Sequence, residues 1–152
     1  MGAYQTKMKK IKTALISIYN KKKLKPLLNI LKKNKIKVIS SGGTYKEIKR
    51  LKFICEKISE FTNFPEILDG RVKTLHPKIH AGILNKRERK SHLKDLKNYK
   101  FENIDLVIVN FYPFENTLEK TKNHKKIVEN IDIGGPTMVR SAAKNYKDVT
   151  VI

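Results

Sequence analysis

The sequence predicts an α/β doubly wound fold, in which a mostly parallel sheet carries helices on both faces. Short apolar runs that are typical of strands alternate along the chain with segments whose apolar residues recur at helical spacing. The run at residues 104–110 is nearly continuous, as expected for a strand buried on both faces of a parallel sheet. Parallel strands require crossover connections, which the intervening helices would supply.

The first unit is a strand followed by a helix. Residues 13–18 form a short β-rich apolar run. Leu24, Leu27, Leu28 and Leu31 then stand at positions i, i+3, i+4 and i+7, which predicts that they share one face of a helix.

The second unit ends its strand in a pair of glycines. We expect a strand at 38–41, a break at Gly42-Gly43 and a helix capped by Thr44. A third short strand fits residues 53–58.

The second half of the chain supplies the remaining elements. The run at 104–110 is the strongest strand signal, and a lysine-rich stretch near 117–130 is expected to be helical. Pro136 suits the first position of another helix, and residues 148–152 begin a further strand.

One domain is expected from a length of 152 residues, of which 39% are hydrophobic and 32% are charged. Residues 1–12 are expected to form an N-terminal leader, with Met8 as a candidate natural start, and residues 13–152 the folded domain. Because the chain stops inside an apparent strand, we expect this domain to be truncated at its C-terminus.

The net charge of +20 has two interpretations. A nucleic-acid binder would use such a charge to neutralise phosphates. Compositional drift of a solvated surface would give the same charge, and the split of 34 basic residues into 29 Lys and 5 Arg favours it, because Arg is preferred for bidentate contacts to phosphate and guanine. The lysines are also spread along the chain, so we expect no specific nucleic-acid partner.

Several classes of protein are excluded by the sequence. No apolar run approaches the roughly 20 residues of a membrane span, so no membrane partner is expected. Cys55 is the single cysteine, which excludes a disulfide framework and a thiolate metal site and fits a reducing cytoplasm. His76 and His80 are four residues apart, but no acidic third ligand follows at a metalloprotease spacing, so we expect no metal.

Six of the seven glycines fall in three places, and the first is a candidate phosphate site. Residues 40–44 lie between a strand and a helix, where backbone N–H groups, hydroxyl groups and a helix N-terminus can surround a phosphate. A plain turn with a Thr cap is the alternative for the same residues. Lys21, just past the first strand, would lie at the same edge of the sheet and could supply a cation.

The other two glycine segments carry charged side chains. The polar stretch at 69–77 includes Arg71 and Lys73, and loops held by a rigid sheet are where binding groups concentrate. Asp132 precedes the Gly134-Gly135 turn, whose N–H groups could stabilise an oxyanion.

Four segments resemble the N-terminal IMP cyclohydrolase domain of the bifunctional purine biosynthesis proteins, AICAR transformylase/IMP cyclohydrolase. They are Ser-Gly-Gly-Thr at 41–44, DGRVKTLHP at 69–77, NFYPF at 110–114 and IDIGGPTMVRSAAKN at 131–145. The resemblance runs in order from Thr13 to Ile152. The chain departs from the family pattern at Tyr19-Asn20, where the family has Ser-Asp, and at Tyr146, where it commonly has His.

The resemblance implies a methylglyoxal-synthase-like fold and closure of the purine ring. In that reaction 5-formamidoimidazole-4-carboxamide ribotide (FAICAR) loses water to give IMP, the last step of de novo purine biosynthesis. The enzyme class is a hydrolase acting on cyclic amidines, running in the ring-closing direction, and it needs no cofactor and no metal. The transformylase domain is absent from this sequence, so no transformylase activity is expected, and the family's homodimer forms mainly through that missing domain.

The resemblance also assigns roles to residues. Lys144 would be the principal proton donor and acceptor, coupled to Asp132, while Lys73 and Tyr112 would stabilise the oxygen and assist loss of water. The remaining predicted residues would bind the purine nucleotide: Ser17, Asn20, Lys21, Ser41, Gly42, Gly43, Thr44, Arg71, Val72, Thr74, Asn110, Ile133 and Gly134.

A second hypothesis is a non-catalytic module of the same fold that binds a phosphate ligand. By sequence, the two hypotheses differ only in the need for Lys73, Lys144, Asp132 and Tyr112, and all four are present.

Overall fold

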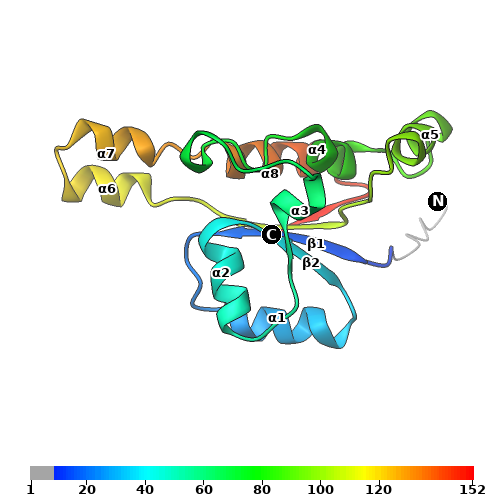
Figure 1. Ribbon diagram of the computed structural model, residues 1–152, viewed down its shortest axis with the longest axis horizontal. Coiled ribbons are helices and arrows are strands. Elements are labelled where there is room, and N and C mark those ends of the chain that lie inside the picture. Colours follow the sequence, from blue (N-terminus) through cyan, green and yellow to red (C-terminus); the bar gives the residue numbers. More distant parts are fainter. Residues whose placement is uncertain (1–8) are drawn as a thin grey trace, which may run out of the picture.

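The computed structural model describes residues 9–152, which form a five-stranded sheet with helices on both faces (Figure 1). The strands stand in the order β3-β2-β1-β4-β5, and each neighbouring pair is parallel. The predicted doubly wound fold is therefore confirmed. The strands are β1 (Thr13–Ile18), β2 (Lys37–Ser40), β3 (Glu56–Lys57), β4 (Leu106–Asn110) and β5 (Thr150–Val151). Of the predicted leader, residues 1–8 lie outside the described residues.

The sheet separates the core into two layers, and the central strand β1 contributes side chains to both. Leu15 packs into the cluster on one face of the sheet, whereas Ala14 and Ile16 pack into the cluster on the other face. All three side chains are fully buried, as the alternation of side chains along a central strand requires.

Two helices cover the face shown at the bottom of Figure 1: α1 (Leu24–Lys33) and α2 (Gly42–Arg50). Leu24, Leu28 and Leu31 of α1 are buried against the sheet, so the predicted apolar face of this helix is confirmed. Ile48 anchors α2 in the same cluster.

Three helices cover the opposite face: α3 (Ile58–Thr62), α4 (Pro77–Leu84) and α8 (Gly134–Lys144). They bury Phe61, Ile79, Ile83 and Met138 against the sheet. Helices α4 and α8 lie side by side (Figure 1). Residues 77–84 and 134–144, which are distant in the sequence, therefore lie in one layer.

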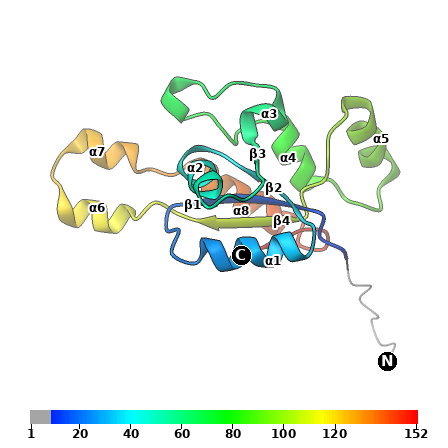
Figure 2. The same cartoon turned by 60° about the horizontal axis from the view of Figure 1, so that its bottom comes forward.

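A short 3-10 helix, η1 (Leu68–Gly70), precedes α4, and the remaining α-helices lie beyond the two ends of the sheet. Helix α5 (Lys90–Tyr99) is at one end, and the pair α6 (Phe114–Lys120) and α7 (His124–Glu129) is at the other (Figure 2). The helical stretch predicted near 117–130 is thus two helices. The break is fixed by Asn123, whose side chain caps α7 by accepting a hydrogen bond from the N–H of Lys126.

The strands predicted at 38–41, 104–110 and 148–152 are Lys37–Ser40, Leu106–Asn110 and Thr150–Val151 in the structure, and three further boundaries are wrong. The strand predicted at 53–58 is reduced to Glu56–Lys57, with Ile54 93% exposed before it and α3 beginning after it. Helix α2 begins at Gly42, so its N-cap is Ser41 and not Thr44. Helix α8 begins at Gly134, two residues before Pro136, and the Asp132 carboxylate accepts a hydrogen bond from the N–H of Gly135 in its first turn.

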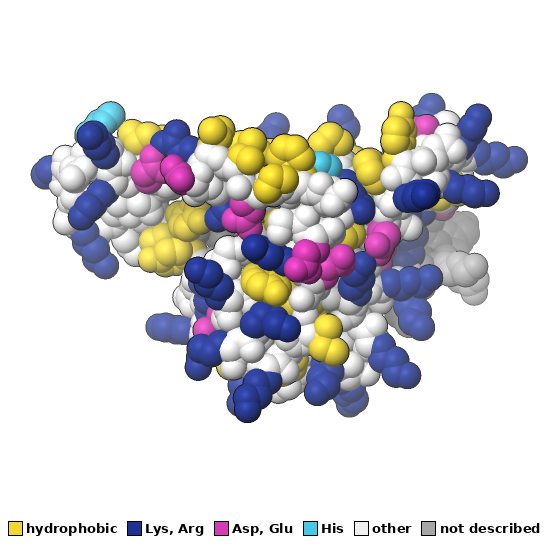
Figure 3. Space-filling model, viewed as in Figure 1, with side chains coloured by type: hydrophobic (Ala, Val, Ile, Leu, Met, Phe, Trp, Pro, Cys, Tyr) yellow, Lys and Arg dark blue, Asp and Glu magenta, His cyan; other side chains and the backbone are white. Residues whose placement is uncertain are grey.

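On the face in view in Figure 3, the basic side chains are spread over several elements. Figure 3 shows lysine and arginine side chains over the α1–α2 layer and at both ends of the face in view. Among the described residues, no helix is both long and apolar enough to cross a membrane.

Candidate functional site

A cavity of about 540 Å³ opens at the carboxyl edge of the sheet. Its wall includes Ser17 and Ile18 from the end of β1, Ser41 after β2 and Asn110 at the end of β4. The chain reverses its direction of winding between β1 and β4, and ligands of open α/β sheets bind at such a point. Helices α6 and α7 extend beyond this edge (Figure 2), and α7 contributes Glu129 to the wall.

The fold brings most of the predicted residues to this one cavity, although they come from five separate parts of the chain. Those that line it are Ser17, Lys21, Ser41, Gly42, Gly43, Thr44, Arg71, Lys73, Thr74, Asn110, Tyr112, Asp132, Ile133 and Gly134. Asn20, Val72 and Lys144 lie outside its lining.

The N-terminus of α2 forms the first wall of the cavity. The first N–H groups of a helix have no partner within the helix, and the Ser41 side chain makes no capping bond to them. Gly42 enters the helix with a φ of +52°, a backbone conformation that favours glycine. The N–H groups and the helix dipole at this end favour an anion.

Lys21 adds a cation beside this helix end. A Cβ atom added to Gly43 would lie 3.8 Å from Lys21 Nζ. The same ammonium group donates a hydrogen bond of 2.9 Å to the carbonyl of Tyr19, which holds it at the mouth of the β1–α1 loop. The structure therefore places Lys21 where the sequence predicts a phosphate-binding cation.

Thr44 and Asn110 line the cavity, but their side chains form hydrogen bonds to the backbone of residues 18–20. Thr44 Oγ1 accepts a hydrogen bond from the N–H of Ile18 at 3.1 Å and donates one to its carbonyl at 2.8 Å. Asn110 Oδ1 accepts from the N–H groups of Tyr19 and Asn20, at 2.6 and 3.0 Å, and its Nδ2 donates to the carbonyl of Asn20. The side chain of Asn110 thus clamps the loop that carries Lys21.

Lys73 reaches the second wall of the cavity between two glycines. A Cβ atom on Gly42 would lie 3.2 Å from Lys73 Nζ, and one on Gly70 would lie 2.4 Å from its Cε and 2.9 Å from its Nζ. Gly70 has a φ of +86°, so its conformation also favours glycine. Two glycines from distant segments therefore leave space for one lysine side chain.

The turn that presents Lys73 is tightly constrained. Ile67 and Val72 form an isolated antiparallel bridge, and between them Leu68 and Asp69 have φ values of +54° and +53°. A bulky residue such as leucine rarely adopts this conformation, and strained backbone of this kind clusters at functional sites.

Asp132 lies at the start of α8 on the same side of the cavity. Its Oδ1 accepts a hydrogen bond of 2.9 Å from the N–H of Gly135, so this N–H is engaged and not free for the oxyanion that the sequence suggested. Tyr112 is half-exposed in the cavity wall, and its ring packs edge-on against Tyr19, with 5.7 Å between the ring centroids.

The mouth of the cavity contains an ion pair that the sequence did not reveal. The guanidinium of Arg71 donates hydrogen bonds to both carboxyl oxygens of Glu129. These bonds lower the pKa of the Glu129 carboxyl, and both side chains are exposed. Glu129 stands in a lysine-rich segment without any motif, so only the three-dimensional arrangement identifies it.

A sequence model described as the MGS-like domain matches residues 23–137. The chain belongs to the MGS-like domain family. The match includes β2, β4 and the segments that form most of the cavity wall. The predicted fold family is therefore confirmed.

Curated relatives of this MGS-like domain carry the name bifunctional purine biosynthesis protein PurH. The protein from Prochlorococcus marinus subsp. pastoris is 53% identical over 140 residues, which are 91% of this chain and 27% of that protein. Those from Clostridioides difficile and Clostridium acetobutylicum are 52% and 49% identical, over 93% of this chain and 28% of each protein. The chain thus spans little more than a quarter of the length of these relatives.

A solved structure, the crystal structure of ForH, has the same fold. It superimposes with a TM-score of 0.78 at 32% sequence identity, covering 91% of this chain and 71% of that chain.

In this MGS-like domain, Lys144 and Arg140 are exposed side chains on the last turns of α8. Lys144 lies about 15 Å along the helix axis from Gly134, which lines the cavity. Lys144 thus lies apart from the cavity lining that includes Asp132, and the coupling of these two residues stays a prediction.

The two histidines of the 76–80 segment have structural partners. His76 Nδ1 accepts a hydrogen bond from the N–H of Lys78 at the start of α4, and His80 Nδ1 lies 3.0 Å from Ser141 Oγ on α8. In the described part of the chain no three His, Cys, Asp or Glu side chains gather as a metal site would require.

Proposed function

We propose that this MGS-like domain is an IMP cyclohydrolase that converts FAICAR to IMP with loss of water. The four motifs that resemble this enzyme family support the proposal, as does the name of the relatives, which places them in purine biosynthesis. The cavity volume of about 540 Å³ lies in the range of small-molecule sites.

One observation carries the proposal: a single cavity has an anion-binding wall and a second wall with proton-transfer groups. The N-terminus of α2 with Lys21 suits the phosphate of a nucleotide. Lys73, Tyr112 and Asp132 suit the chemistry at its other end. A phosphate-binding module without catalysis would need only the first wall.

The reaction joins two groups of the same substrate. The carboxamide nitrogen attacks the formyl carbon, the new C–N bond gives a carbinolamine, and the formyl oxygen leaves as water with one proton from each nitrogen. Holding the phosphate and the ring of FAICAR fixes both reacting groups at close range, so positioning supplies part of the acceleration.

We assign to Lys73 and Tyr112 the role of stabilising the formyl oxygen as it becomes negative. An ammonium and a phenol can donate hydrogen bonds to an oxygen that becomes negative, and such donors are most effective when they are already in position. Lys73 lines the cavity in the space that Gly42 and Gly70 leave open, so its ammonium is available for this role.

We assign proton removal from the nitrogen to Asp132, whose carboxylate lines the cavity. A general base must come within hydrogen-bond reach of the proton that it removes. Lys144, to which the resemblance gives this role, lies outside the lining, so its part in the reaction is a separate prediction. Lys144→Ala tests that prediction, because wild-type turnover in this variant would remove Lys144 from the mechanism.

We further propose that the ligand is the small purine nucleotide FAICAR or IMP rather than a nucleic acid, and that the domain acts in the cytoplasm. The dispersed lysines and the single buried Cys55 support these two points.

Purified chain incubated with FAICAR tests the function. IMP formation, followed against the uncatalysed cyclisation, is expected to be faster and to saturate with FAICAR. A folded chain that binds IMP without accelerating its formation would instead support the phosphate-binding module.

A further inference from the structure

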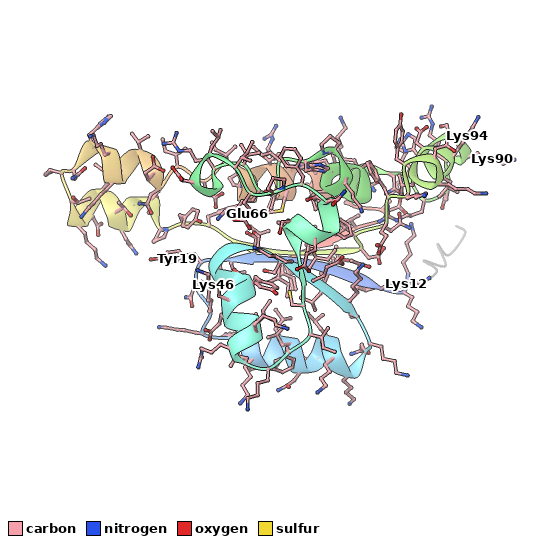
Figure 4. All side chains as sticks on the ribbon, viewed as in Figure 1. Lys12, Tyr19, Lys46, Glu66, Lys90 and Lys94 are labelled. Atoms are coloured by element: carbon pink, nitrogen blue, oxygen red, sulfur yellow. The ribbon has the colours of Figure 1, made fainter. Side chains whose placement is uncertain are left out.

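Glu66 places a carboxylate next to Lys73, behind the cavity wall. Glu66 Oε2 lies 3.9 Å from Lys73 Nζ, and the two side chains are only 23% and 28% exposed. Figure 4 shows Glu66 at the end of the sheet where Tyr19 also lies, between the upper helices and α2. Glu66 does not line the cavity, and no motif in the sequence points to it.

This carboxylate is unusual because it makes no hydrogen bond to any described residue. Its Oε1 is buried without a partner, and Oε2 has Lys73 as its nearest cation. Burying a carboxylate without hydrogen bonds is costly, and buried polar groups normally have partners. Glu66 is therefore a buried polar side chain whose burial is not offset by hydrogen bonds to the described residues.

The position of Glu66 explains why the Lys73 side chain takes one direction, with its ammonium near the Glu66 carboxylate. Lysine has a flexible four-carbon stem, and ordering such a side chain carries an entropic cost. The space left by Gly42 and Gly70 permits the extended side chain but supplies no partner for its ammonium. Glu66 supplies a negative charge at the end of that path; the Oε2 atom also lies 3.8 Å from the position that a Cβ of Gly70 would take.

We propose that Glu66 is a positioning residue that holds the ammonium of Lys73 at the point where it meets the substrate oxygen. The proposal rests on the function proposed above. Glu66 acts through Lys73 and does not touch the substrate. The long separation of 3.9 Å leaves the N–H bonds of Lys73 available for a substrate oxygen.

The first test is the kinetics of Glu66→Gln, which removes the charge and keeps the shape. Since misplacing a reacting group by about 1 Å can cost on the order of a hundredfold in rate, kcat is expected to fall about ten- to a hundredfold while KM stays within about threefold. Glu66→Asp, which restores the charge on a shorter side chain, is expected to recover part of the loss. Glu56→Gln is the matched control, because Glu56 is a half-buried carboxylate whose Oε2 lies 2.8 Å from the Lys37 ammonium, outside the cavity lining.

The second test measures the order of Lys73 without any substrate. In ¹⁵N-labelled protein, an ammonium that is held and shielded gives an NH₃⁺ signal, whereas a freely exchanging one does not. The signal of Lys73 is identified by its absence in Lys73→Met, and it is expected to disappear in Glu66→Gln but to persist in Glu56→Gln.

Loss of this signal together with a lower kcat in Glu66→Gln would support the proposal. Persistence of the signal in that variant would overturn it, and so would loss of the signal with wild-type kcat. The wild-type protein alone is a further test, because a missing Lys73 signal contradicts an ordered ammonium even if Glu66→Gln does not fold. If wild-type protein makes no IMP, the proposed function fails, and the NMR comparison still decides whether Glu66 orders Lys73.

Discussion

Gly70→Ala is the substitution that most directly tests whether the path of Lys73 matters. The new Cβ would lie 2.4 Å from Lys73 Cε, where ordinary contacts begin at 3.4 Å, so the lysine stem must retreat by about 1 Å. Alanine would also have to adopt the φ of +86° that glycine adopts at this position.

The expected effects on stability and on turnover differ in size. A left-handed backbone costs an L-residue about 1–2 kcal/mol, and a displaced rotamer about 1 kcal/mol more. A loss of about 2 kcal/mol would lower the melting temperature of a domain of this size by about 4–8 °C. Displacement of Lys73 by about 1 Å is expected to lower kcat by on the order of a hundredfold.

The assay is IMP formation from FAICAR at a temperature at which the variant is folded, alongside thermal unfolding. Gly82→Ala is the control, because its Cβ would lie 2.7 Å from the carbonyl oxygen of Glu102, away from the cavity. That variant is expected to lose stability, by about 1–3 kcal/mol for an overpacked core, and to keep wild-type kcat while folded.

Two results would refute this reasoning. Wild-type kcat in folded Gly70→Ala would show that the position of Lys73 does not limit the reaction. Equal losses of kcat in Gly70→Ala and Gly82→Ala would show that turnover follows general stability and not the path of this lysine.

Three further predictions follow from the structure. Glu129→Gln frees Arg71 at the cavity mouth, so calorimetry should find IMP binding about two- to fivefold tighter; weaker binding would show that Glu129 itself contacts the ligand. Burial lowers the pKa of His80, so the unfolded chain binds a proton at a higher pH than the folded chain and the free energy of unfolding should fall as the pH drops below about 6.5. Urea titrations should show a smaller fall in His80→Gln, and an unchanged pH dependence would contradict this assignment. Burial also raises the pKa of the Cys55 thiol to about 12, so a thiol reagent at pH 8 should label it in urea but not in the folded protein; rapid labelling of folded protein would contradict this.

The sheet could be predicted because its strands are apolar in consecutive positions and its first helix has a regular apolar face. Residues 13–18 and 104–110 carry their signal within a few residues, and the signal depends on burial alone. Helices α3 and α4 were not predicted as elements, because their short lengths provide little periodicity and their burial depends on the sheet beneath them.

The parts of the candidate site that contain glycine, at Gly42 and Gly70, could be predicted from the sequence. Gly42 and Gly70 have positive φ, and a Cβ atom at either position would crowd Lys73, so the requirement that excludes other side chains is visible in the sequence. Glu66 and Glu129 were not predictable, because an isolated glutamate has no local signature and its partner is fixed only by the fold. The structure also gives Asn110 a clamping role that its place at the end of a strand did not suggest.

The central claim is that one cavity both binds the nucleotide and stabilises the negative charge that develops on its formyl oxygen. The turnover of Lys73→Met tests this claim most directly. Removal of one preorganised donor to a developing oxyanion costs about a hundred- to a thousandfold in kcat. We predict a loss of this size in Lys73→Met, with IMP binding retained at the N-terminus of α2. A kcat near that of the wild type in this variant would contradict the account.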